Sequence, residues 1–334
     1  MNELEQNIFA IIQDAFPLEE RPYQVLAEQL GSDEQSAFAA VENLRQSGII
    51  RRIGGVYDSK KLGFISRLCA GKVPTILAGA SDDSALNKFA ATVNEIPAIT
   101  HNYVRSHEYN VWFTIIARSE AEIQKIVDGL CASTDLHDVH LLNATKKFKI
   151  NTVMGAAGAP ANRNGDEKRH CGPKAKQSPA HFLSANDRAR IRIACTDCPH
   201  TLTPFKDWSV SCDELREDLA LKRMRRFGAI LRHQEAGFAY NAMVCFANSE
   251  FGFQNSELKK AGEILAGKPY ISHCYERPSF EGFPYTLYAM MHAQSAEELD
   301  RNIKEAAASI GNPDYAVLHS LHELKKTSFR FFAA

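Results

Sequence analysis

The chain has 334 residues, 45% of them apolar, so it is long enough to form more than one hydrophobic core. Its 39 basic and 40 acidic side chains nearly cancel, which excludes a general electrostatic footprint for nucleic acid. The first residues lack the basic start of a signal peptide, and no apolar run has membrane-spanning length. We therefore expect a cytoplasmic protein that does not enter a membrane.

The first 63 residues predict a winged helix-turn-helix domain. Apolar residues at helical spacing predict a helix over 4–16, which ends before Pro17. Helices over 23–30 and from about 33 to 47 follow, and each ends at a glycine. A hairpin after 49–52 would supply the wing, with Gly54 and Gly55 allowing its bend. A protein-protein platform and DNA recognition both remain open as roles for such a domain.

Residues 64–150 predict a ferredoxin-like domain. Strands are expected over 64–73, 98–104, 109–117 and 139–150, with helices over 82–93 and 120–132. The order is βαββαβ. Residues 151–183 are predicted to be a flexible linker. The stretch 151–180 has no aromatic residue and is rich in Gly, Pro, Ala, Asn and Lys, which is typical of such a linker.

The second half repeats this order. Residues 184–238 predict a winged helix-turn-helix that is about eight residues shorter than the one in the first half. Residues 239–334 predict a second ferredoxin-like domain. The shortening makes insertion of a recognition helix into DNA less plausible. Both halves are expected to finish in a basic, aromatic strand, the second one within 324–332. Cys195, Cys198 and His200 lack the second ligand pair of a structural zinc site, so no metal site is predicted.

Two motifs occur once in each half. The stretch RRIGGVYDSKKLGF at 51–64 matches RRFGAILRHQEAGF at 225–238, and His-x-Tyr-x-Arg occurs at 101–105 and at 273–277. Two copies at a period near 174 exclude a solenoid and indicate two similar halves that pack as a fused dimer would. The predicted fold class is therefore α+β, with two tandem repeats.

The His-x-Tyr-x-Arg motif is the main candidate site. On a strand, alternate residues share one face about 7 Å apart, so the three side chains would lie together. A single copy would favour a solvated strand face with a satisfied histidine, but duplication favours an anion-binding site with acid-base capacity. The candidates are His101, Tyr103, Arg105, His273, Tyr275 and Arg277. Basic residues of the two hairpins are weaker candidates: Arg51, Arg52, Arg225, Arg226, Arg232 and His233.

Taken together, RR(I/F)G(G/A)(V/I), LGF or AGF, His-x-Tyr-x-Arg and the ending KKTSFRFF resemble the siroheme decarboxylases. These enzymes are relatives of the Lrp/AsnC regulators, and their two subunit types are sometimes fused. The resemblance covers nearly the whole chain outside the linker. It implies AsnC-type ferredoxin-like domains in an internal pseudo-dimer, with further homo-oligomerisation open.

The resemblance also implies an activity. Siroheme would lose carbon dioxide from its C12 and C18 acetates to give 12,18-didecarboxysiroheme, for heme or heme d1 synthesis. His101 and His273 would act as acids with Tyr103 and Tyr275 as helpers, while Arg105, Arg277 and the hairpin basics would bind substrate carboxylates. No cofactor is required, and iron ligation by one histidine stays open. The alternative function is that of an Lrp/AsnC-like or heme-sensing transcription regulator.

Overall fold

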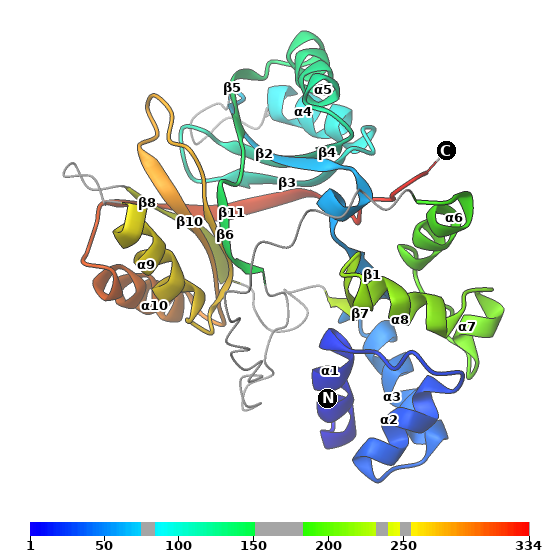
Figure 1. Cartoon of the computed structure of the whole chain (residues 1–334). Helices are drawn as coiled ribbons and strands as arrows, with labels where there is room; N and C mark the ends of the chain where they lie inside the picture. The colour runs from blue at the N-terminus through cyan, green and yellow to red at the C-terminus, as the bar shows by residue number, and fades with distance from the viewer. Residues whose placement is uncertain (75–83, 151–182, 232–239, 248–254, 334) are drawn as a thin grey trace. The chain divides into compact units, whose positions relative to one another are not determined.

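The computed structural model describes residues 1–74, 84–150, 183–231, 240–247 and 255–333, which form two compact units (Figure 1). The first unit contains the described residues within Met1–Leu62, Val153–Ala236 and Arg330–Ala334, and the second contains those within Gly63–Thr152 and Gly237–Phe329. Each unit therefore combines segments from both halves of the chain. Among the described residues, no helix combines the length and apolar composition needed to cross a membrane.

The first unit contains both helix-turn-helix segments. The first has α1 (Glu3–Asp14), α2 (Pro22–Leu30), α3 (Glu34–Gln46) and β1 (Ile50–Tyr57), and a 3-10 turn, Ser59–Leu62, follows β1. The second has α6 (Ala185–Ala194), α7 (Pro204–Asp207), α8 (Cys212–Ala220) and β7 (Met224–Leu231). Compared with α2 and α3, α7 and α8 are shorter by five and four residues, which agrees with the predicted shortening.

The predicted wing hairpin is wrong, because β1 pairs antiparallel with β7 of the other half and opposes Gly54 to Gly228. These glycines lie in mid-strand, where a helix end approaches the backbone. A Cβ on Gly54 would lie 2.6 Å from the Thr196 carbonyl oxygen, and one on Gly228 would lie 2.5 Å from that of Ile12. Both residues therefore serve close packing between the halves instead of a turn.

The second unit contains two βαββαβ segments, as predicted, and the first of them is followed by one further strand, β6. The first has β2 (Ile65–Lys72), α4 (Ser84–Asn94), β3 (Ile99–Arg105), β4 (Val111–Ala117), α5 (Glu120–Ser133), β5 (His137–Leu142) and β6 (Lys146–Ile150). The second has β8 (Tyr240–Ala247), α9 (Asn255–Ala266), β9 (Ile271–Glu276), β10 (Tyr285–Ala293), α10 (Ala296–Ser309) and β11 (Tyr315–Lys326).

The strands of both segments join one sheet in the order β5-β2-β4-β3-β11-β8-β10-β9-β6. The predicted strand over 139–150 is therefore wrong as a single element. Its first part, β5, pairs with β2 of its own half, and its second part, β6, pairs with β9 of the other half. The predicted tail strand also ends early, because β11 stops at Lys326. The later part of β11 pairs with β3 of the first half.

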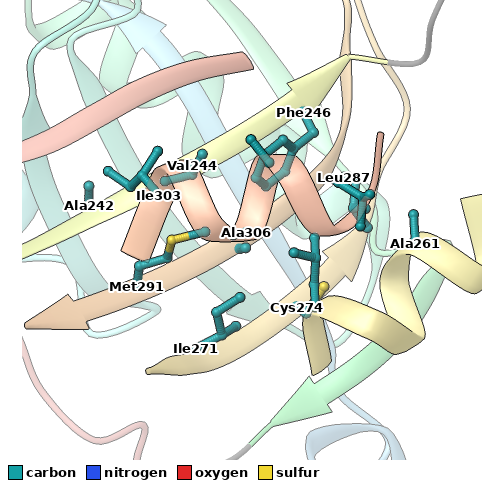
Figure 2. Close-up of a cluster of buried hydrophobic side chains, with 14 of the residues drawn as sticks. Ala242, Val244, Phe246, Ala261, Ile271, Cys274, Leu287, Met291, Ile303 and Ala306 are labelled. Atoms are coloured by element: carbon teal, nitrogen blue, oxygen red, sulfur yellow. The ribbon is translucent and has the colours of Figure 1, made fainter. Parts of the chain in front are cut away.

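In the described part of the second unit, three apolar clusters hold the elements together. One lies between β8–β10 and the helices α9 and α10, where Phe246, Ile271, Leu287 and Ile303 pack (Figure 2). A similar cluster lies beneath α4 and α5. The third contains residues of both halves, including Trp112, Cys245, Phe283 and Leu318. Burial of this mixed cluster stabilises the pairing of the halves, since apolar burial contributes roughly 25 cal/mol per Å².

Candidate active site

The two His-x-Tyr-x-Arg motifs occupy equivalent strands, β3 and β9. Each motif strand has a neighbour from its own half, β4 or β10, and a neighbour from the other half, β11 or β6. We call β11 and β6 the exchanged strands, because each pairs with a motif strand of the other half. On β11 Lys326 opposes His101, and on β6 Lys147 opposes Tyr275. Both halves therefore supply polar groups to each motif.

The motif side chains lie on the sheet face away from the helices. Val104 and Cys274, which alternate with motif residues, belong to the apolar clusters under the helices. On the other face, the Arg105 guanidinium lies 5.2 Å from the centroid of the Tyr103 ring, and that of Arg277 lies 5.0 Å from the Tyr275 ring. The tyrosine and arginine of each motif thus contact each other, as strand alternation predicts.

Arg105 is 5% exposed, and its Nη1 donates to the Leu318 carbonyl at 3.1 Å and to Ser320 Oγ at 3.0 Å. Burial lowers the pKa of Arg105 to about 10. None of these partners is a carboxylate, and its Nε is buried with no hydrogen bond to any described residue. A desolvated cation without a counter-ion is costly, so this guanidinium is suited to receive an anion.

Arg277 repeats this arrangement in the second half. Its Nη1 donates to the Leu142 carbonyl of the first half, and its buried Nε has no hydrogen-bond partner among the described residues. Burial lowers the pKa of Arg277 as well. The guanidinium also lies 5.8 Å from the ring of Tyr288, whose hydroxyl is buried and has no hydrogen-bond partner in the described part of the chain. Burial raises the pKa of the Tyr288 phenol, so it stays a protonated donor.

Each motif histidine has a hydroxyl neighbour that sequence analysis missed. His101 Nδ1 lies 2.9 Å from Thr100 Oγ1, and His273 Nδ1 lies 2.9 Å from Ser272 Oγ. The signal was present in the sequence, since a hydroxyl residue precedes the histidine in both copies. Such a bond orients an imidazole ring and leaves Nε2 on the side away from the hydroxyl.

The hairpin arginines belong to the first unit, whereas both motifs belong to the second. Arg52 donates to the Thr196 carbonyl at 3.2 Å, Arg225 donates to that of Tyr57 at 3.2 Å, and Arg226 donates to those of Gln13 and Ala229. Burial lowers the pKa of Arg52 and of Arg226 to about 10. These three side chains therefore have a structural task that the sequence did not indicate.

The structure thus places two sets of candidates on one sheet, the histidine, tyrosine and arginine of each motif. Arg51 lies on β1, and it belongs to the first unit, as the other described hairpin arginines do. Arg232 and His233 lie outside the described residues.

Comparison with known proteins gives matches over nearly the whole chain. A model described as an AsnC-like ligand binding domain matches residues 61–149 and 235–325. A model described as a siroheme decarboxylase NirDL-like HTH domain matches residues 5–51. The two models thus cover both ferredoxin-like segments and the first helix-turn-helix.

Individual relatives agree with these matches. The siroheme decarboxylase of Hydrogenobacter thermophilus is 31% identical over 341 residues, which cover 99% of this chain and 96% of the relative. The siroheme decarboxylase alpha subunit of Desulfovibrio desulfuricans is 44% identical over 150 residues, which cover 45% of this chain and 82% of that subunit. The crystal structure of the siroheme decarboxylase NirDL in co-complex with an iron-uroporphyrin III analogue has a TM-score of 0.67 at 27% identity, covering 99% of this chain and 95% of that chain.

Proposed function

The chain belongs to the siroheme decarboxylases, and on that premise we propose that it removes the C12 and C18 acetate carboxylates of siroheme. The product would be 12,18-didecarboxysiroheme, which serves heme or heme d1 synthesis. One observation carries the proposal above the others. Each half holds an arginine, buried at Arg105 and half-buried at Arg277, whose Nε is buried and has no hydrogen-bond partner among the described residues. Neither has a carboxylate partner among those residues, and each contacts the tyrosine of its His-x-Tyr-x-Arg motif.

The substrate chemistry fits these side chains. A ring-linked acetate loses carbon dioxide when the macrocycle accepts the electron pair, and a nearby acid assists by protonation. The methylene carbon that remains must then gain a proton to become a methyl group. In this proposal His101 and His273 supply protons, Tyr103 and Tyr275 assist them, and Arg105 and Arg277 bind carboxylates. The chemistry needs no organic cofactor.

Siroheme carries more carboxylates than two arginines can bind, so further cations are needed. Lys326 opposes His101 and Lys147 opposes Tyr275 on the exchanged strands, which places both on the motif face of the sheet. These lysines supply positive charge from the half that does not contain the motif they serve. The hairpin arginines are weaker candidates for this task, because carbonyl groups of their own unit engage Arg52, Arg225 and Arg226.

The direct test is anaerobic incubation of the purified chain with siroheme, followed by mass spectrometry of the tetrapyrrole. The expected result is stepwise loss of two carbon dioxide units per molecule. A chain heated to denaturation serves as the control for spontaneous loss. Tetrapyrrole that is bound but unchanged after many hours would refute decarboxylation and leave a heme-sensing protein as the better description.

The competing function is transcription regulation, because the chain retains helix-turn-helix segments. The charge of these segments disfavours it. The helix α3 has two acidic residues and one basic one, Arg45, which is bound to Asp197 at 2.8 Å. In α8 there are four acidic residues and one basic one. DNA phosphates attract basic surfaces, so neither helix suits a major groove.

A further inference from the structure

Ser272 connects two histidines in the second half. Its Oγ lies 2.9 Å from His273 Nδ1 on one side and 2.9 Å from His292 Nε2 on the other. Ser272 is 6% exposed and His292 is 7% exposed, so solvent has little access to this connection. The Oγ also lies 3.4 Å from the Met290 carbonyl oxygen, a longer and weaker contact than either histidine bond.

The first half has only part of this arrangement. Thr100 bonds to His101 as Ser272 bonds to His273. Met290 is the register partner of His273, and Thr114 is that of His101, so His292 corresponds in position to Ile116. An isoleucine cannot continue a hydrogen-bond chain. Among the described residues, this connection from the motif histidine to a histidine on the neighbouring strand is therefore found in the second half.

A single hydroxyl restricts what the two rings can do. Serine has one proton to donate and two lone pairs to accept with. When both rings are neutral and the serine proton points to one of them instead of to the more distant Met290 carbonyl, the other ring must donate its own proton to the serine oxygen. The tautomer of His273 is therefore linked to that of His292 through Ser272, whereas Ile116 stands at the position in the first half that corresponds to His292.

We propose that Ser272 and His292 are positioning residues for His273. They hold its ring with Nδ1 on the hydroxyl, so that Nε2 is the nitrogen presented for proton transfer to the tetrapyrrole. The inference rests on the proposed decarboxylation and makes the two motifs unequal. The second-half motif has a ring that bonds to a serine shared with a second histidine, and the first-half motif has a ring that bonds to Thr100. Neither Ser272 nor His292 needs to touch the substrate.

The first test needs no substrate. Nitrogen-15 labelling of the histidines in the full chain reports by NMR which ring nitrogen carries a proton. Ser272→Ala should shift the signals of His273 and of His292 together, while Ser272→Thr should restore them. Ser309→Ala is the control, since that hydroxyl bonds to the Ala306 carbonyl on α10. If Ser272→Ala leaves both histidine signals unchanged, Ser272 does not link the rings.

The second test uses turnover of siroheme. Ser272→Ala and His292→Phe should each lower kcat about 10- to 100-fold with little change in KM, the size of effect seen when a metal-ligating histidine loses its outer hydrogen-bond partner. Ser272→Thr should recover most of the rate, because threonine plays this part at Thr100. Equal loss from Ser272→Ala and Ser272→Thr would indicate disturbed packing and would overturn the positioning role. A wild-type chain that does not decarboxylate siroheme would refute the proposed function, while the NMR experiment would still decide the linkage.

Discussion

The Leu142 carbonyl accepts a hydrogen bond from the Arg277 guanidinium, which joins the last part of the first half to the motif of the second. The Leu318 carbonyl does the same for Arg105 in the opposite direction. Both acceptors lie where a strand leaves its own half for the other, since β6 begins shortly after Leu142 and β11 crosses to β3 after Leu318. Each motif is therefore built on a strand pairing that one half alone does not contain.

This exchange predicts how the chain tolerates cleavage. Residues 1–155 and 180–334, expressed together as separate chains, should co-purify and decarboxylate siroheme, because strand pairing and the mixed apolar cluster need no covalent link. Either piece alone should be weakly active or inactive, since β3 would lack β11 and β9 would lack β6. Co-purification and turnover measure this. Two pieces that are each fully active and do not associate would contradict a shared site.

The histidines have a direct kinetic prediction. His101→Ala and His273→Ala should each reduce decarboxylation about 10²- to 10⁴-fold if they act as general acids, while circular dichroism shows an intact fold. Mass spectrometry should then show which variant accumulates the singly decarboxylated tetrapyrrole. Full turnover by the double variant would remove both histidines from the mechanism. The alternative role of one histidine is to ligate the siroheme iron. Absorption and EPR spectra of bound siroheme test it, because loss of an axial ligand changes both spectra.

Replacing a motif arginine should weaken siroheme binding without lowering the stability of the fold. Arg277→Met should weaken siroheme binding roughly 30-fold or more, since removing one partner of a buried charged contact costs at least about 2 kcal/mol. The free energy of unfolding should change little, because the lost hydrogen bond to Leu142 is offset by the absence of a buried, uncompensated charge. Arg118→Met, which removes an exposed guanidinium near the Phe64 ring, is the control. Unchanged affinity together with a large loss of stability would assign Arg277 a purely structural role.

DNA binding should be absent. The acidic α3 and α8 predict no sequence-specific complex at physiological salt, where specific binders reach about 10⁻⁸ M or tighter. Fluorescence anisotropy with a pool of genomic fragments, followed by footprinting of any retained fragment, is the measurement. A footprint with nanomolar affinity and a clear preference over random DNA would favour the regulator.

A pH prediction concerns the first unit. The carboxylate of Asp187 is partly buried, which by itself would raise its pKa, but hydrogen bonds from Ser184 and Arg190 outweigh this and lower it from 3.8 to about 2. A pKa depressed in the folded state gives stability above pH 4 that is lost as the pH falls toward 2. Asp187→Asn should therefore cost about 2 kcal/mol near pH 7 and progressively less below pH 4.

The chain allows this loss to be measured locally. It has two tryptophans, of which Trp208 lies in the first unit and Trp112 in the second. In a Trp112→Phe background, fluorescence during urea denaturation reports on the first unit alone. A difference between Asp187→Asn and its parent that does not vary from pH 7 to pH 2 would contradict the charge-based explanation.

The sequence predicted most secondary structure but misplaced the wing and the last strand of the first half. The helix boundaries followed from local signals, such as the Asp33 cap of α3 and Gly31, whose φ of +63° suits a helix end. Gly54 and Gly55 resembled a turn because glycine permits both a bend and a close approach. Residues 139–150 resembled one strand because side chains alternate between the two faces with the same period before and after the break at 143–145.

What the sequence determined by itself is the repeat, the α+β order of elements and the placement of His, Tyr and Arg on one strand face. Each of these depends on residues close together in the chain, and a period of 2 or 3.6 shows them directly. Only the tertiary structure decided which strands exchange, which carbonyls engage Arg105 and Arg277, and that Ser272 joins His273 to His292. These contacts link residues up to about two hundred positions apart, and a strand's own pattern does not specify which edge it will join.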